Sequence, residues 1–366
     1  MRGLKLLLAG VSLLFLVGCG GGSGGDLVTL QRNVAPYSDN PLYYQQWYFE
    51  RDDAFYSRYG IDPDAHIHPW PTNQYAGRGV KVAIIDDALD VWHEDLRGAI
   101  VQTYDTQSGT SDVSPRTIYD NHGTEVTGIV AAGSNTLGIS GIAPGAQVYF
   151  IRLPFDTAIP DSMIVDAFER ARAWGVDVIN CSWGSGNVSD TVRAAIEDVA
   201  LNGRDGKGTV IVFASGNGGD DGIGDPIGND ESSIPEVLAV GATNIYNQRT
   251  AYSNYGPELD LVAPGGEYLG LTTLDRSGSA GDDPGNYLLY DSQLAFGGTS
   301  AAAPIVTGVV AQLLEADGNL TRTEVMQALM ANADKIDPAQ CSYDATGHSD
   351  LCGFGKVNAM QTLLGL

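Results

Sequence analysis

Three polar residues are of the types that nucleophilic catalysis needs, and each stands beside an apolar segment that could hold it in place. Asp86 directly follows an apolar run, His122 precedes a Gly-Thr pair, and Ser300 lies in a stretch rich in Gly and Ala. A serine hydroxyl is a weak nucleophile until a neighbouring base accepts its proton. His122 could be that base, and Asp86 could fix the tautomer of the imidazole and stabilise its protonated form. The three residues therefore predict a serine nucleophile activated by a histidine.

A fourth residue, Asn217, has the chemistry to stabilise the product of such an attack. It follows the apolar run 210–214 within Ser-Gly-Asn-Gly-Gly. A side-chain amide there can donate to a developing oxyanion, and a helix that begins near Ser300 adds positive potential. Taken singly, each residue has a structural alternative, since Asp and Ser commonly cap helices and Asn is common in Gly-rich turns. The catalytic interpretation rests on the four residues together.

The segments that carry these residues alternate between strand-like and helix-like patterns. Short apolar runs predict strands at 80–85, 147–151, 176–181, 210–214 and 237–240. Helices are expected at 123–132, 161–174, 189–202, and from near 299 and 323. This alternation predicts an α/β fold, a doubly wound and mostly parallel sheet with helices on both faces. Functional residues of such sheets gather beyond the carboxyl ends of the strands, where Asp86 and Asn217 are expected.

Composition narrows the classes of partner. The chain has 366 residues, with 45 Asp and Glu against 20 Lys and Arg, so its formal net charge is −25. That excess repels phosphate backbones and argues against a nucleic-acid partner. It suits a Ca²⁺ binder or an enzyme that prefers basic substrates. An apolar content of 43% is enough for a large core, so disorder throughout the chain is excluded.

The order Asp, His, Ser, with these flanking residues, resembles the subtilisin-like serine peptidases. Four motifs carry the resemblance: Ile84-Ile85-Asp86-Asp87, His122-Gly123-Thr124, Ser215-Gly216-Asn217 and Gly298-Thr299-Ser300-Ala301-x-x-Pro304. The resemblance covers about residue 40 to the end and implies a serine endopeptidase that works through an acyl-enzyme. It assigns Asp86, His122 and Ser300 to the triad and Asn217 to the oxyanion hole. It also assigns Ser182, Trp183 and Gly184 to the strand that pairs with substrate backbone. A catalytically inactive peptide-binding module is the alternative from another class.

Within that family the chain resembles the kexin and furin branch. The segment 40–47, the doubled Asp86-Asp87 and the string 215–219 are shared with it. The resemblance implies that Asp87 faces the substrate residue before the scissile one. Acidic residues after Asn217 could select Lys or Arg, or could form a solvated acidic loop: Asp220, Asp221, Asp225, Asp230 and Glu231. Cleavage after basic residues and broad degradation therefore both remain open.

The family resemblance also implies a structural Ca²⁺ site. In this chain it would take the side-chain oxygens of Asp95 and Asn135 and the carbonyls of Gly133, Leu137 and Ile139. Asn40 or a nearby Gln could add another oxygen. Hard oxygen ligands of this kind suit Ca²⁺. An ordinary turn that contains an Asn is the alternative.

The N-terminus has the form of an export signal. A basic start, the apolar run 6–17 and Leu-Val-Gly-Cys19 resemble the lipobox of bacterial lipoproteins. We expect a signal at 1–19, a flexible tether and short segment at 20–39, and a peptidase domain at 40–366. Lipidation of Cys19 would anchor the protein outside the cytoplasm, and Gly20 favours the outer membrane of a double-membraned bacterium. The alternative is a secreted protein with an ordinary signal peptide.

Two further expectations concern folding. Cys341 and Cys352 close a short loop and are expected to pair in an oxidising compartment, while Cys181 lies in an apolar strand and reads as a buried thiol. Only residues 26–39 separate the tether from the domain, whereas relatives usually carry a longer propeptide that assists folding. We therefore expect the protein to fold unaided or with a chaperone in trans.

Overall fold

A computed structural model describes residues 38–366 apart from 50–52, 71–73 and 219–223. The predicted signal, Cys19, the tether up to residue 37, Asp220 and Asp221 lie outside the described residues. Residues 37–366 form one compact unit.

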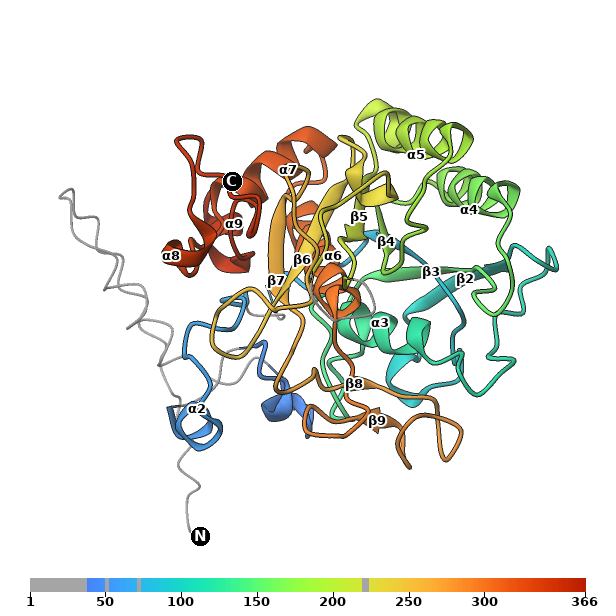
Figure 1. Ribbon diagram of the computed structural model, residues 1–366. Helices are drawn as coiled ribbons and strands as arrows, with labels where there is room; N and C mark the ends of the chain where they lie inside the picture. Colours follow the sequence, from blue (N-terminus) through green and yellow to red (C-terminus); the bar gives the residue numbers. More distant parts are fainter. Residues whose placement is uncertain (1–37, 50–52, 71–73, 219–223) are drawn as a thin grey trace, which may run out of the picture. The chain divides into compact units, whose positions relative to one another are not determined.

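A seven-stranded sheet forms the centre of this unit, with strand order β2-β3-β1-β4-β5-β6-β7 (Figure 1). Every neighbouring pair in it is parallel. The strands are β1 (Lys81–Asp86), β2 (Ile100–Asp105), β3 (Gln147–Arg152), β4 (Val178–Cys181), β5 (Val210–Ala214), β6 (Leu238–Thr243) and β7 (Leu261–Pro264). The predicted doubly wound parallel sheet is confirmed. The strands β2 and β7 are additions to the five predicted ones.

Helices cover both faces of the sheet because alternate strand residues are apolar on both sides. One face, with Val82 and Ile84 of β1, packs with α3 (His122–Ala131) and α6 (Thr299–Ala316). The other face, with Ala83 and Ile85, packs with α4 (Asp161–Trp174) and α5 (Asp190–Asn202). A strand that is buried on both faces has a continuous apolar sequence, which is why the apolar runs predicted five of these strands.

The remaining elements lie around this framework. A small antiparallel pair, β8 (Thr273–Leu274) and β9 (Tyr287–Leu288), precedes α6. The other helices are α2 (Asp53–Tyr59), α7 (Arg322–Ala331), α8 (Pro338–Cys341) and α9 (Ala359–Leu364). Among the described residues only α6 is long and apolar enough to cross a membrane, and it is mostly buried in the core.

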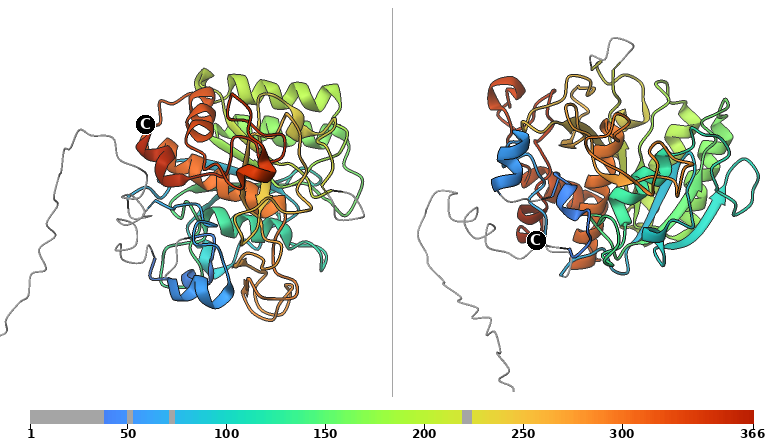
Figure 2. Two further views of the ribbon diagram at one scale, coloured as in Figure 1. Left: turned by 60° about the vertical axis from the view of Figure 1, so that its left-hand side comes forward. Right: turned by 90° about the horizontal axis from the view of Figure 1, so that it is seen from below.

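The segment before β1 is part of the core. Trp47, Tyr48 and Phe49 are almost fully buried. The Trp47 indole donates to the Gly270 carbonyl at 2.7 Å, and the Ile67 carbonyl accepts from the Ala359 amide. Figure 2 shows this N-terminal segment, in blue, beside the C-terminal elements. These contacts join the segment before β1 to the C-terminal part of the domain.

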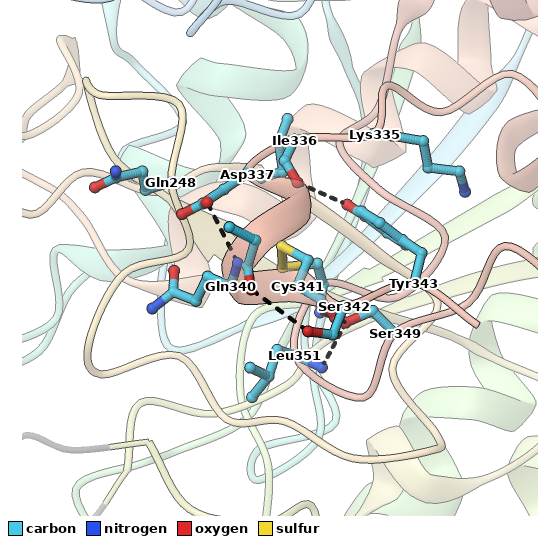
Figure 3. The surroundings of a disulfide bond; sticks show 12 residues. Gln248, Lys335, Ile336, Asp337, Gln340, Cys341, Ser342, Tyr343, Ser349 and Leu351 are labelled. Carbon is cyan, nitrogen blue, oxygen red and sulfur yellow. Dashed lines mark hydrogen bonds between the residues drawn. A yellow bond between two sulfur atoms is a disulfide. The ribbon is translucent and has the colours of Figure 1, made fainter.

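A disulfide joins Cys341 at the end of α8 to Cys352, with their Cα atoms 5.6 Å apart (Figure 3). Beside the disulfide, the Tyr343 hydroxyl donates a hydrogen bond to the Ile336 carbonyl at 3.2 Å. Cys181 is the free, buried cysteine among the described residues. Both structural interpretations of the cysteines are therefore confirmed.

Candidate active site

The pair Asp86 and His122 is formed in the structure. Asp86 is the last residue of β1 and is fully buried, and His122 is the first residue of α3. The His122 Nδ1 atom lies 2.8 Å from Asp86 Oδ1. The second oxygen, Oδ2, is buried and has no hydrogen-bond partner among the described residues. A buried carboxylate on Nδ1 fixes the tautomer in which Nε2 is free to accept a proton.

Asp87 caps the helix that carries His122. Its carboxylate accepts the His122 amide at 3.2 Å and the Gly123 amide at 2.7 Å, and the residue is only 5% exposed. Gly123 is required here, because a Cβ would lie 2.3 Å from the Ala88 carbonyl oxygen. Asp87 thus satisfies the amides that a helix start leaves unpaired. Its predicted contact with substrate stays a prediction.

Ser300 and Ser182 bond to each other reciprocally. The Ser300 hydroxyl donates to the Ser182 carbonyl at 3.0 Å, and the Ser182 hydroxyl donates to the Ser300 carbonyl at 2.9 Å. Pro304 explains the second bond, because it has no amide to give the Ser300 carbonyl four residues earlier. The start of α6 is thereby fixed beyond the end of β4, with Ser300 partly exposed.

A buried chain of polar side chains supports Ser182, and the sequence reasoning missed it. Thr307 of α6 donates to Asn180 Oδ1 at 2.9 Å, and Asn180 Nδ2 donates to the Ser182 hydroxyl at 3.0 Å. Both Thr307 and Asn180 are fully buried. The available signal was Asn180 itself, a polar residue inside an apolar strand. Buried polar groups need partners, so this chain fixes the register of α6 against β4.

Asn217 lies beside the start of α6. Its Oδ1 accepts the Thr299 amide at 2.8 Å and the Thr299 hydroxyl at 3.0 Å. Gly298 has φ +87°, and a Cβ on it would lie 3.1 Å from Asn217 Nδ2. With its oxygen held on Thr299, the amide leaves Nδ2 as the donor, and Asn217 is exposed to solvent. This arrangement suits a donor to an oxyanion at Ser300.

Residues 182–184 extend from the end of β4, which pairs with β1. The Trp183 indole donates to the Ile85 carbonyl at 2.8 Å, while Gly184 is exposed. A Cβ on Gly184 would lie 2.6 Å from the Asp230 carboxylate, so this carboxylate approaches the backbone of Gly184 closely. Asp230 accepts the Gly186 amide at 2.8 Å, and the buried Glu231 accepts the Ser185 amide at 2.8 Å. Asp230 and Glu231, two of the predicted acidic residues, therefore contact the segment that follows β4.

The electrostatics of the site centre on His122. Burial lowers the pKa of His122, but the Asp86 carboxylate outweighs it, with smaller contributions from Asp87 and Glu125, and raises the pKa to about 9. Burial and the charge of Asp86 raise the pKa of Asp87 to about 7. Burial also raises the pKa of Glu125, one turn after His122, to about 8. The imidazolium is thus strongly favoured next to these carboxyls.

Three of the five residues predicted to hold Ca²⁺, Gly133, Asn135 and Ile139, contact Asn40, and Asp95 contacts Asn135. The Gly133 carbonyl lies 2.5 Å from Asn40 Nδ2, and the Ile139 carbonyl also accepts from that atom. Asp95 accepts the Asn135 side-chain amide at 2.8 Å, and burial raises the pKa of Asp95 to about 6. Leu137 is 39% exposed, and its amide donates to Asn135 Oδ1 at 2.8 Å. Carbonyl and carboxylate oxygens are the ligand type that a hard cation prefers. In the structure the Gly133 and Ile139 carbonyls and the Asp95 carboxylate accept side-chain amides, and no group of three His, Cys, Asp or Glu suited to a metal occurs among the described residues.

Comparison with known proteins identifies the family to which the chain belongs. The model of the subtilase family matches residues 77–355, and the chain belongs to this family. A calcium-dependent protease of Trichormus variabilis is 36% identical over 315 residues, covering 78% of this chain and 46% of that protein. Subtilisin E of Bacillus subtilis is 33% identical, covering 78% of this chain and 65% of that protein. The chain thus spans about half of the first relative and two thirds of the second.

Solved structures support the same fold. The serine protease of Aeromonas sobria has a TM-score of 0.77 at 25% identity, covering 94% of this chain and 70% of that one. The same protease in complex with its chaperone has a TM-score of 0.76, covering 89% and 67%. These relatives confirm the predicted subtilisin-like fold. Membership of the kexin and furin branch stays a prediction.

Proposed function

We propose that this protein is a serine endopeptidase that hydrolyses peptide bonds through an acyl-enzyme. The observation that carries the proposal is the buried Asp86 carboxylate on His122 Nδ1, at the end of the sheet where α6 presents Ser300. Family membership supports it, because the relatives described above are proteases.

The reaction follows from the roles of these residues. Ser300 Oγ attacks the carbonyl carbon and its proton passes to His122 Nε2, while Asp86 stabilises the imidazolium. Asn217 Nδ2 and the Ser300 amide donate to the oxyanion. The imidazolium then protonates the leaving amine, the C–N bond breaks, and the acyl group stays on Ser300. Water gives a proton to His122 Nε2 and attacks the ester carbonyl carbon. The bond between the acyl carbon and Ser300 Oγ then breaks, Oγ takes the proton back from His122, and the carboxylic acid product leaves.

Cleavage of a diverse peptide library by the full chain tests the proposal, with Ser300→Ala as the control. Cuts that are present with the native chain and absent with the variant support the endopeptidase. A folded native chain that binds peptides and cuts none would establish the inactive binding module instead.

The pH dependence of activity is expected to reflect the raised pKa of His122. Only the neutral imidazole can accept the Ser300 proton, so activity is lost as pH falls through this pKa. We expect the midpoint of the acidic limb of kcat/KM to lie above the ordinary value of 6.5, towards 9. A profile between pH 5 and 11 checks this, and a midpoint at or below 6.5 would contradict the electrostatics of the site.

For specificity we propose a preference for cleavage after basic residues. The support is the position of Asp230 and Glu231 against residues 184–186, together with the net charge of −25. Desolvated carboxylates favour Lys or Arg strongly over neutral residues. Asp230→Asn should reduce cleavage after Lys and Arg, whereas the exposed Asp225→Asn should not. Cuts after large apolar residues in the native chain would favour a broad, degradative subtilisin.

We propose that Asp95, Asn135 and the carbonyls of Gly133, Leu137 and Ile139 hold a structural Ca²⁺. The convergence of two of these carbonyls with Asp95 and two side-chain amides supports this, as does the calcium dependence in the name of a relative. The amide oxygens of Asn40 and Asn135 could complete the set. A bound cation would neutralise Asp95, whose burial is otherwise unfavourable for its charge.

Chelation of Ca²⁺ is therefore expected to lower the melting temperature. A ligand that binds only the folded state stabilises it by about 2.7 kcal/mol at a hundredfold excess over its Kd. For a domain of this size that corresponds to a fall of several degrees in excess EGTA, measured by differential scanning calorimetry. Asp95→Asn should melt lower and respond less, with the exposed Asp291→Asn as the control. A melting temperature unchanged by EGTA would exclude the site.

We propose further that Cys19 carries a lipid anchor that holds the protein on a bacterial membrane outside the cytoplasm, with the outer membrane favoured and secretion as the alternative. The lipobox-like sequence supports this, and mass spectrometry of the native N-terminus tests it.

A folding chaperone in trans is proposed because the similar protease of Aeromonas sobria was solved with one. Refolding of the pure chain in good yield would overturn the need for that partner.

A further inference from the structure

The residue before His122 is of the type that caps helices, yet it does not cap this one. Asn121 occupies the cap position of α3 and makes no side-chain hydrogen bond to the helix amides. Asp87 accepts those amides instead. Asn121 is only 4% exposed, and its side-chain amide bonds outside the helix, where Nδ2 donates to the Ile118 carbonyl at 3.2 Å.

Both ends of the Asn121 amide bond to the loop between β8 and β9. Its Nδ2 donates to Asp282 Oδ1 at 2.8 Å, and its Oδ1 accepts from an Arg276 guanidinium nitrogen at 3.2 Å. The same nitrogen of Arg276 donates to the Thr117 carbonyl at 2.8 Å. The loop therefore holds the segment immediately before His122 at two points.

The loop itself is organised for this contact. The buried Asp275 accepts the amides of Arg276 at 2.7 Å, Asp282 at 3.1 Å and Asp283 at 2.8 Å. Gly281 is needed in this turn, since a Cβ on it would lie 1.9 Å from Asp275 Oδ1. The carboxylate of Asp275 thus places Arg276 and Asp282 on the side of Asn121.

The strand that enters the loop is fixed along α3 as well. The Thr273 hydroxyl of β8 donates to the Glu125 carbonyl at 2.6 Å. A Cβ on Gly128 would lie 2.5 Å from a Leu274 carbon, so β8 packs directly on the helix. Figure 1 shows β8 and β9 below α3. The loop therefore starts from a strand that is fixed on α3, and its hydrogen bonds to Asn121 hold that residue in a fixed position.

We propose that Asp282 and Arg276 are positioning residues for catalysis: through Asn121 they hold His122 at the distance from Ser300 that proton transfer requires. This inference rests on the proposed peptidase function. Neither residue belongs to a catalytic motif. Both bond to the segment before His122, at Asn121 and, for Arg276, also at Thr117.

The physical reason is the sensitivity of proton transfer to geometry. Asp86 fixes Nδ1 of the ring, and Asp87 fixes the backbone amides of His122 and Gly123. The chain entering His122 is held by Asn121. Displacement of a catalytic group by about 1 Å can lower the rate about a hundredfold. Loss of one hydrogen bond to the loop should therefore lower kcat and leave KM almost unchanged.

A pair of neighbouring carboxylates offers a matched test. We compare Asp282→Ala with Asp283→Ala in the full chain, since both variants remove one charge from the same loop. Asp282→Ala is expected to lower kcat about tenfold, with KM within about twofold, while Asp283→Ala leaves both unchanged. Asp282→Asn should retain most activity, because its amide oxygen can still accept from Asn121. Equal kcat values for the two alanine variants would overturn the proposal.

An exchange of the two side chains separates positioning from general stability. Asn121→Asp places two carboxylates together and is expected to lose activity. The double variant Asn121→Asp, Asp282→Asn restores a donor and an acceptor and should recover kcat. The native chain, Asn121→Asp, Asp282→Asn and the double variant are compared at the high-pH plateau, so that a shifted pKa of His122 does not affect the comparison. A double variant no more active than Asn121→Asp would overturn the proposal.

Hydrogen exchange makes the result independent of catalysis. Faster exchange of the backbone amides of 117–124 and 276–286 in Asp282→Ala than in Asp283→Ala supports the proposal, and equal exchange opposes it. If the native chain cuts no peptide, the proposed function fails while this comparison still decides whether the loop positions α3.

Discussion

Replacement of Ser300 by Ala is expected to lower kcat by about 10⁶-fold, the largest effect of any single change in this chain. The hydroxyl is the atom proposed to form the acyl-enzyme, and the neighbouring Thr299 hydroxyl is fully buried and donates to Asn217 Oδ1. The reciprocal bonds between Ser300 and Ser182 also make the variant informative, because the Ser182 hydroxyl still donates to the residue 300 carbonyl. The helix start should therefore keep its position.

The measurement is hydrolysis of a peptide substrate found with the native chain, followed under single-turnover and steady-state conditions. Residual activity should stand about 10³–10⁴-fold above the uncatalysed rate, because the oxyanion donors and substrate binding remain. An unchanged melting temperature serves as the control for folding. A Ser300→Ala protein with undiminished proteolysis would disprove the assignment of the nucleophile.

The second-largest expected effect is that of Asp86→Asn, about 10⁴-fold in kcat. The substitution keeps the shape of the side chain but removes the charge that stabilises the imidazolium of His122. A buried amide must also point its NH₂ either at His122 Nδ1, which favours the wrong tautomer, or at the Oδ2 position, which lacks a partner among the described residues. Both arrangements impair the base.

The pH profile gives this prediction a second, independent readout. Asp86 is the largest influence that raises the pKa of His122. In Asp86→Asn the acidic limb of the residual activity should therefore move to lower pH. A variant whose limb stays where the native one lies, or whose kcat falls less than tenfold, would show that Asp86 is not the partner that governs His122.

The sequence by itself identified the strands that carry the site. Strands buried on both faces must be apolar throughout, so β1, β3, β4, β5 and β6 were visible as short runs between helical patterns. The catalytic residues follow such runs or open helices, and their neighbours are small for local steric reasons, as at Gly123 and Gly298. Information of this kind lies within a few residues of each motif.

Edge elements were less visible. The strand β2 lies at the edge of the sheet and is only partly buried, so its pattern lacks a continuous apolar run. The strands β8 and β9 have two residues each, too few for a periodicity to appear. Their positions depend on α3 and on the loop between them.

The partners of individual polar side chains were decided only by the tertiary structure. The resemblance to the kexin and furin branch implies a substrate contact for Asp87, which stays a prediction, and the fold sets the Asp87 carboxylate on the amides of His122 and Gly123. Asn121 reads locally as a helix cap, and the fold turns it to Asp282, 161 residues later. A hydrogen bond between distant segments leaves no local pattern. The sequence therefore determined the fold and the places of the motifs around Asp86, His122, Asn217 and Ser300. Only the packing of α3, α6 and the β8–β9 loop determined how these side chains are held.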